Sequence, residues 1–284
     1  MIKFAIIGNG FVGQATKILQ TKDNQMKIYD TDPTKCEPLN ITISNLEDCN
    51  IIFISVPTPS KSDGSCYIDI VESVVQDIRN TNTNAYIVIR STIVIGTCDR
   101  LGCYFMPEFL TEKNWMEDFK NCENWIFGIT DNNNAINKNF IKCITSLITN
   151  AFESGNIKYN KITFVSNKEA EMIKYYRNTF LSLKVSFSNE IYDFCKINNI
   201  NYDIISEISC EDKRIGKSHI NVPGHDGKRG FGGTCFPKDT AALLCEYKKL
   251  GLKSYIINAA VERNNEIDRP EKDWENNVGR AFIH

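Results

Sequence analysis

A glycine-rich turn close to the first residue constrains the fold of this chain more than any other feature. The apolar run of residues 2 to 7 leads directly into Gly8-Asn9-Gly10-Phe11-Val12-Gly13, and a helix-forming stretch follows. In such a strand–turn–helix unit, the first glycine permits the tight turn, the second lets the backbone approach a pyrophosphate, and the third lets helix and strand pack closely. The pattern predicts the opening unit of a dinucleotide-binding sheet, although glycines also serve such turns for packing alone.

An acidic residue at the end of the next strand indicates which dinucleotide is bound. The short strand 26 to 29 ends at Asp30, where a carboxylate accepts hydrogen bonds from ribose hydroxyls and repels a 2′-phosphate. The expected cofactor is therefore NAD rather than NADP. The alternative is that Asp30 is a solvated strand end. The residues expected at the pyrophosphate and the ribose are Gly8, Gly10, Phe11, Val12, Gly13 and Asp30.

Further apolar runs of strand length alternate with connections that include helical segments, such as residues 68 to 79. These runs are residues 51 to 56, 85 to 89, 103 to 106 and 125 to 129. Strands that alternate with crossovers predict an α/β fold with a doubly wound parallel sheet of the Rossmann type. The chain has 284 residues, which is room for two domains, and we expect this sheet to occupy residues 1–165.

The second part of the chain, residues 166–284, is predicted to be a helical domain. From Ser166 to Asn198 there is no Gly or Pro, and apolar residues recur at helical spacing. Ser166 and Glu169 have the spacing of a capping box, which places the start of one long helix. Two more helices are expected, from about Pro237 to Leu250 and from about Ser254 to Glu266.

Composition excludes several classes of protein. A net charge of −2 provides no basic stripe for nucleic acid. No apolar run approaches the roughly 18 residues of a membrane span, so we expect no membrane partner. The 11 cysteines form no CxxC pair and there are 3 histidines, which argues against a disulfide framework and against a metal site. We expect a reducing, cytoplasmic location in which most cysteines are small buried hydrophobes.

Cys235 is the exception among the cysteines. It precedes Pro237, which suits the first turn of a helix, so the thiol lies near a helix N-terminus where the dipole and Lys238 favour a thiolate. Glycines before it leave room for a ligand. The alternative is a buried thiol in a glycine-rich turn, with Lys238 and Asp239 as an exposed pair.

Other polar residues have two possible explanations each. Lys174 and Asn178 are one helical turn apart and can bind an oxyanion together, or form a solvated stripe. Several residues follow predicted strands at the edge where α/β sheets bind ligands, yet such residues also cap helices and form turns. They are Val56, Thr58, Ser91, Thr92, Glu108 and Glu112.

Seven segments along the chain belong together. They are the glycine turn, Ser55-Val56-Pro57-Thr58-Pro59, Arg90-Ser91-Thr92, Pro107-Glu108-Phe109-Leu110, Lys174 with Asn178, Arg214-Ile215-Gly216, and Gly230 to Asp239. In this order and over nearly the whole chain, they resemble the UDP-glucose/GDP-mannose dehydrogenase family. The resemblance implies a homodimer, formed by the long helix, that oxidises C6 of a sugar nucleotide with two NAD. UDP-glucose is the expected substrate. The rivals are a UDP-N-acetylhexosamine or GDP-mannose, and a non-catalytic NAD-binding dimerisation module.

The resemblance also implies roles for individual residues. Cys235 is the expected nucleophile, which forms a thiohemiacetal and then a thioester; Lys174 and Asn178 stabilise the oxyanion, Glu108 assists hydrolysis, and Thr92 and Asp239 position water. The residues expected to border the cofactor are Lys35, Val56, Thr58, Ser91, Glu112 and Lys238. Those expected to contact substrate are Glu108, Phe109, Leu110, Lys174, Asn178, Arg214, Arg229, Phe231 and Gly232.

Three departures from the family pattern shape these expectations. Family members usually continue into another α/β domain that closes over the nucleotide, and this sequence ends at His284 without a counterpart. The connection from Thr92 to Pro107 looks short for a full crossover helix. The loop 220 to 229 is longer than usual, and we expect Lys228 and Arg229 to supply diphosphate contacts that the further domain otherwise makes.

Overall fold

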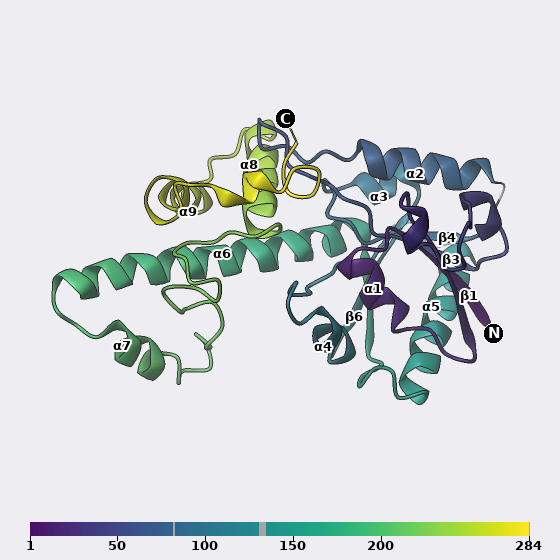
Figure 1. The fold of residues 1–284 in the computed structure, drawn as a ribbon, viewed down its shortest axis with the longest axis horizontal. Helices are drawn as coiled ribbons and strands as arrows, with labels where there is room; N and C mark the ends of the chain where they lie inside the picture. Colours follow the sequence, from purple (N-terminus) through teal and green to yellow (C-terminus); the bar gives the residue numbers. More distant parts are fainter. Residues whose placement is uncertain (82, 131–134, 284) are drawn as a thin grey trace. The chain divides into compact units, whose positions relative to one another are not determined.

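A computed structural model describes residues 1–81, 83–130 and 135–283. The chain divides into two units, Met1–Thr58 with Ile68–Lys174, and Pro59–Tyr67 with Tyr175–His284. The division falls within one long helix, so that helix contributes to both units. Figure 1 labels the helices α1 to α9 and the strands β1, β3, β4 and β6.

The first unit is built on a seven-stranded sheet in the order β2-β1-β3-β4-β5-β6-β7. The strands are β1 (Ile2–Ile7), β2 (Asn24–Tyr29), β3 (Ile51–Ile54), β4 (Tyr86–Ile89), β5 (Tyr104–Phe105), β6 (Trp125–Ile129) and β7 (Ile162–Ser166). Strands β1 to β5 are parallel to one another, so their carboxyl ends lie at one edge of the sheet.

The prediction of a wholly parallel sheet was wrong at one pairing. β6 is antiparallel to β5, joined through Phe105 and Gly128, and β7 then runs parallel to β6. The connection between β5 and β6 contains only the short helix α4 (Trp115–Lys120), and an antiparallel neighbour needs no crossover helix. Strand β7 was not predicted; its β-branched residues directly precede the long helix.

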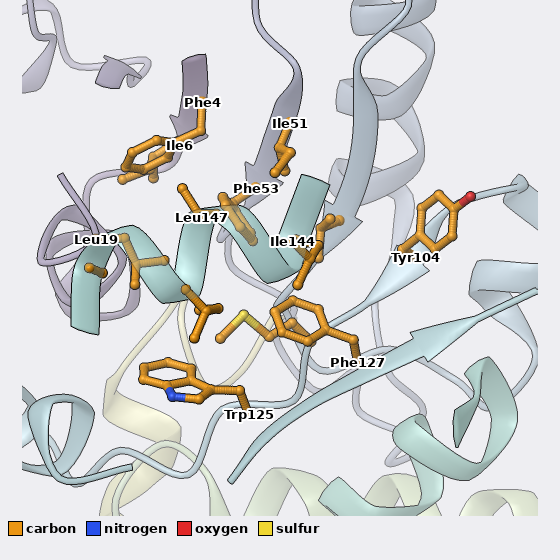
Figure 2. Packing of buried hydrophobic residues seen from close by; sticks show 14 of the residues in the cluster. Phe4, Ile6, Leu19, Ile51, Phe53, Tyr104, Trp125, Phe127, Ile144 and Leu147 are labelled. Atoms are coloured by element: carbon orange, nitrogen blue, oxygen red, sulfur yellow. The ribbon is translucent and has the colours of Figure 1, made fainter. Parts of the chain in front are cut away.

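Helices cover both faces of the sheet. One apolar cluster joins α1 (Phe11–Lys17), α4 and α5 (Ala135–Glu153) to alternate residues of β1, β3, β4 and β6. Figure 2 shows side chains of this cluster, including Leu19, Phe53 and Trp125 around Leu147 of α5. A second cluster joins the intervening strand residues to α2 (Asp69–Asn80), to the five-residue α3 (Thr97–Leu101) and to Ala170. This alternation confirms the doubly wound arrangement, and the shortness of α3 confirms the tight connection after Thr92.

The helix α6 (Asn167–Ile197) begins as the sequence predicts. The backbone N–H of Ser166 donates to the Glu169 carboxylate at 2.8 Å, and the N–H of Glu169 donates to Ser166 Oγ at 3.3 Å. This reciprocal pair is the predicted capping box, which satisfies two otherwise unpaired groups at the start of the helix.

The second unit is mainly helical, as predicted. Besides most of α6 it contains α7 (Tyr202–Ser209), α8 (Phe236–Lys249) and α9 (Ile256–Arg263). A π-helical turn, η3 (Asn264–Asp268), continues α9 directly. The segment Pro59–Tyr67 joins this unit through Ser60, whose N–H donates to the carbonyl of Ala281 at 2.9 Å.

Candidate active site

The glycine turn at the end of β1 has the geometry that a dinucleotide requires. Gly8 adopts φ +94°, and a Cβ there would stand 2.6 Å from the carbonyl oxygen of Ser55. A Cβ on Gly13 would stand 2.1 Å from the carbonyl oxygen of Gly8, so the close approach of helix α1 requires glycine. No described atom lies within 4 Å of the Cβ position of Gly10, which leaves its backbone open to a phosphate group.

Asp30 is held at the end of β2 with its carboxylate oriented by two backbone groups. One oxygen accepts the N–H of Asn9 at 2.7 Å, and the other accepts the N–H of Asp32 at 2.9 Å. Asn9 in turn donates to the carbonyl of Lys35 at 2.7 Å. The turn and the carboxylate therefore form one rigid unit, and these residues fit the ribose and pyrophosphate of NAD.

The loops after β3 and β4 meet at the same edge. Ser91 Oγ donates to the carbonyl of Val56 at 2.6 Å, which ties these two predicted cofactor residues together. Thr58 and Thr92, in the same two loops, are buried, while Glu112 and Lys35 are exposed. Lys35 lies beside Asp32. The carboxyl edge of β1, β3 and β4 thus carries most of the predicted cofactor residues.

A buried ion pair joins the loop after β5 to helix α6. Lys174 Nζ donates to the Glu108 carboxylate and also, at 2.9 Å, to the carbonyl oxygen of Glu108. The other carboxylate oxygen accepts the N–H of Leu110 at 3.0 Å. Lys174 is 1% exposed and Glu108 is 7% exposed. The alternative prediction, that Lys174 belongs to a solvated stripe, is therefore wrong.

A second polar cluster lies in the second unit, at the start of α8. Asp239 is fully buried; one carboxylate oxygen accepts Asn178 Nδ2 at 2.5 Å and the other accepts Lys238 Nζ at 2.9 Å. Burial alone would lower the pKa of Lys238, but Asp239 and the thiols of Cys66 and Cys235 hold that pKa above its ordinary value. Lys238 and Asp239 are therefore not an exposed pair.

Cys235 occupies the N-cap position of α8, where its side chain makes no capping hydrogen bond, and it is partly accessible. Its Sγ lies 3.8 Å from Thr234 Oγ1, and Pro237 occupies the first turn as predicted. Other cysteines have a different character: burial raises the pKa of Cys103 to about 12 and the pKa values of Cys49 and Cys143 to about 11. Seven cysteines are buried, which confirms the prediction of mostly structural thiols and leaves Cys235 as the best placed nucleophile.

Helix α6 carries residues of both clusters. Lys174 is the last residue of the first unit, and Asn178 follows one helical turn later in the second. Residues four apart lie on the same side of a helix, so the two side chains share one side of α6. Both are buried and hydrogen-bonded to a carboxylate.

The structure gives Arg229 a partner set that the sequence did not indicate. Its guanidinium pairs with Asp193 at 2.8 Å and with Asp268 at 2.7 Å, and its Nε donates to Asn189. Lys228 likewise pairs with Glu271 and Asp273. Two carboxylates already neutralise Arg229, so the expected diphosphate contact from this residue has no support in the geometry.

The remaining predicted substrate residues differ in exposure. Arg214 is 90% exposed and is held by Asp212 through a forked pair of hydrogen bonds. Phe231 is buried, while Phe109 and Leu110 are half-buried and pack against opposite faces of the sheet. A Cβ on Gly232 would stand 2.4 Å from the guanidinium carbon of Arg269, which fills the space that the sequence left for a ligand.

No supporting role for Arg90 or Glu171 was predicted from the sequence, because no local pattern indicates what either side chain contacts. Arg90 is fully buried beneath α1, where it donates to Thr16 Oγ1 and to the carbonyl of Val12. Its burial lowers its pKa to about 10. Glu171 of α6 accepts the N–H groups of Gly96 and Cys98, which anchors the loop that follows Thr92. Both act between segments far apart in sequence.

Comparison with known proteins identifies the family. Residues 39–147 match the NAD binding domain of the UDP-glucose/GDP-mannose dehydrogenase family, and residues 168–266 match the central domain of that family. A UDP-glucose 6-dehydrogenase of Campylobacter jejuni is 30% identical over 93% of this chain and 72% of its own length. The chain belongs to the UDP-glucose/GDP-mannose dehydrogenase family.

Further relatives are longer than this chain, and one of known structure has the same fold. A UDP-glucose 6-dehydrogenase of Rickettsia bellii is 30% identical over 88% of this chain, which spans 58% of that protein. The solved UDP-glucose dehydrogenase of Pyrobaculum islandicum has a TM-score of 0.77 at 25% identity, over 94% of this chain and 68% of that one. Family membership confirms NAD as the cofactor and the class of NAD-dependent sugar-nucleotide dehydrogenases.

Two negative observations complete the site. Of the helices in the described ranges, none has the length and hydropathy to span a bilayer. Among the residues that the structure describes, no group of three or more His, Cys, Asp or Glu side chains is arranged to hold a metal ion.

Proposed function

We propose that this chain carries the chemistry of a UDP-glucose 6-dehydrogenase, which converts the C6 primary alcohol of UDP-glucose to a carboxylate. The observation that supports it best is a buried hydrogen-bonded set next to Cys235. Lys238 and Asp239 lie in the first turn of α8, directly after Cys235, and Asn178 of α6 donates to Asp239. Burying two charges is unfavourable unless they are paired and used, and a module that only binds NAD needs no such set beside a thiol.

NAD, when bound, accepts the hydride in each of the two oxidations. In the second, the Cys235 sulfur attacks the C6 aldehyde and forms a C–S bond, and the resulting alkoxide takes up a proton to give a thiohemiacetal. Loss of a hydride from C6 and of the hydroxyl proton leaves a thioester. Water then cleaves the C–S bond, which releases the carboxylate and returns the Cys235 thiol. The balance is one alcohol, two NAD⁺ and one water to one carboxylate, two NADH and three protons.

The chain's own residues supply binding and proton transfer in this scheme. The ammonium of Lys174 and the amide of Asn178 are donors suited to an oxyanion on C6, and both are oriented by carboxylates. Glu108, held by Lys174 and by the N–H of Leu110, is the proposed base for thioester hydrolysis. Thr92 and Asp239 are proposed to position water and to relay protons.

A homodimer and a reducing, cytoplasmic location complete the proposal. Helix α6 exposes an aromatic stripe of Tyr176, Phe180, Phe187 and Phe194, of which Phe187 is 67% exposed. Such a stripe on one helix fits a second copy of the chain. No disulfide joins any of the eleven cysteines, all of which lie within the described residues, as expected in a reducing compartment.

The test is NADH formation by the purified chain with NAD and UDP-glucose, beside Cys235→Ala and a panel of other sugar nucleotides. Two NADH per sugar, with sustained turnover lost in the variant, supports the four-electron scheme. Faster turnover of GDP-mannose or of a UDP-N-acetylhexosamine would replace UDP-glucose by that substrate. NAD binding without NADH from any sugar would favour the non-catalytic module instead.

A further inference from the structure

A buried asparagine, Asn264, lies outside every predicted site and hydrogen-bonds to the loop that precedes Cys235. Asn264 is the first residue of η3 and is fully buried. Its Oδ1 accepts the backbone N–H of Phe231 at 2.7 Å, and its Nδ2 donates to the carbonyl oxygen of Phe231 at 3.1 Å. One side-chain amide thus pairs with both backbone groups of one residue, as a neighbouring β-strand would.

The glycines on either side of Phe231 have no side chain that would prevent this hydrogen bonding. A Cβ on Gly230, which adopts φ +67°, would stand 2.4 Å from Asn264 Oδ1. The guanidinium of Arg269 lies against Gly232 and is fixed by ion pairs with Asp226 and Asp273, each at 2.7 Å. The glycines therefore permit close contact with the segment from Asn264 to Arg269, rather than only with a ligand.

The loop is also held from α6. Asn189, which is 1% exposed, accepts the N–H of Gly230 at 3.4 Å and the Nε of Arg229 at 3.1 Å. Residues 231 to 234 then lead directly to Cys235 at the N-terminus of α8. Cys235 therefore lies only a few residues after Phe231, whose backbone N–H and carbonyl are both held by Asn264.

We propose that Asn264 is a positioning residue for the nucleophile. It acts through the backbone of Phe231, which sets the path of the loop and so the direction in which Cys235 presents its sulfur to an aldehyde carbon. The inference rests on the proposed role of Cys235. It assigns Asn264 no contact with substrate or cofactor.

The test compares Asn264→Ala and Asn264→Asp with wild type, and uses Asn258→Ala as the matched control. Asn258 is an exposed asparagine on α9 that donates to Glu262 within its own helix. Two readouts are taken: steady-state kcat and KM with NAD and UDP-glucose, and the alkylation rate of Cys235 by iodoacetamide, resolved by peptide mass spectrometry. The second readout requires no dehydrogenase activity.

Asn264→Ala is expected to lower kcat by about 10- to 100-fold, because displacement of a reacting group by about 1 Å has effects of that order. The alkylation rate of Cys235 should change in the same variant. KM for NAD should stay within about twofold, since the glycine turn belongs to the first unit. Asn258→Ala should match wild type in both readouts.

In Asn264→Asp, the pH determines whether the side chain at position 264 can make both hydrogen bonds to Phe231. A protonated carboxyl can accept from the N–H of Phe231 and donate to its carbonyl, whereas a carboxylate repels that carbonyl. The charged groups around this position are Arg263, Asp268 and Arg269 on the same segment, Arg229 from the loop and Asp193 from α6. We expect the ratio of variant to wild-type alkylation rate to approach one at about pH 6 and to depart from one by about pH 8.

The outcomes separate the inference from the proposed function. Wild-type kcat and alkylation in Asn264→Ala, or a pH-independent ratio in Asn264→Asp, would overturn the positioning role. If Asn264→Ala does not fold, the pH series of Asn264→Asp still decides, because it compares that variant with wild type at each pH. If wild type yields no NADH with any sugar nucleotide, the alkylation rates alone decide whether Asn264 positions the thiol.

Discussion

Asn178 of α6 donates to the carboxylate of Asp239 on α8 at 2.5 Å, and the other oxygen of that carboxylate binds Lys238. The two partners come from positions 61 residues apart in the chain. Because Asp239 has no exposed surface, each hydrogen bond replaces one that water would make in the unfolded chain. The pair therefore links the stability of the second unit to the proposed chemistry at Cys235.

Asp239→Asn should impair both stability and turnover. It leaves the Lys238 ammonium buried without a counter-charge, which costs about 3–5 kcal/mol when a buried pair is broken on one side. Turnover should fall by about 100-fold or more if Asp239 relays protons. Urea unfolding and NADH formation measure the two effects. Asp203→Asn, at an exposed position in the first turn of α7, is the control, and equal behaviour of the two variants would contradict the assignment.

Lys174 and Glu108 should be energetically coupled. Lys174→Met alone leaves the Glu108 carboxylate buried and unpaired, with an expected loss of about 3–5 kcal/mol in unfolding free energy. Adding Glu108→Gln removes that charge, so the double variant should recover much of the loss. Urea unfolding of the single and double variants gives the coupling energy, and additive effects would show that the ion pair contributes nothing.

Asp30→Ala should weaken NAD binding and narrow the preference for NAD over NADP. The carboxylate is already oriented by Asn9 and Asp32, so a charge-assisted bond to the ribose forms with little reordering. KM for NAD should rise by about 10-fold or more, with a smaller change for NADP. Initial rates with each cofactor test this, with the exposed Asp23→Ala as control. Unchanged KM for NAD would place the adenosine ribose elsewhere.

Asp48 should make the chain more stable above pH 4 than below it. Hydrogen bonds first to Lys27 and then to Lys3 lower the pKa of Asp48 to about 2. A carboxyl whose pKa is lower in the folded state stabilises it above the unfolded pKa of about 4, and that stabilisation is lost as pH falls toward 2. Thermal unfolding of Asp48→Asn and wild type should differ at about pH 5 and converge near pH 2. A constant difference would exclude the ionic origin.

Phe187→Asp should convert a dimer to a monomer. The side chain stands 67% exposed on α6, and a carboxylate buried between two copies would oppose their association. Analytical ultracentrifugation of the variant and wild type measures this. Tyr159→Asp is the control, because Tyr159 is also an exposed aromatic residue but belongs to the first unit. A wild-type chain that is already monomeric would refute the proposed interface.

The sequence by itself predicted the features that depend on neighbouring residues. The glycine turn, Asp30 at the end of β2, the capping box at Ser166 and the position of Cys235 at a helix start were all predicted, because each follows from local backbone preference and short spacing. The alternation of apolar runs with crossovers predicted the doubly wound sheet, while the order of its strands came from the structure. Periodicity is also what located the long helix α6.

Only the tertiary structure decided which charges meet. Spacing allowed Lys174 to be a solvated residue and Arg229 to be a phosphate ligand, yet folding buries Lys174 against Glu108 and surrounds Arg229 with Asp193 and Asp268. The hydrogen bonds between Asn264 and the backbone of Phe231 could not be predicted from the sequence for the same reason. Such pairings depend on which segments become neighbours and how far each is desolvated, and neither property is encoded in local periodicity.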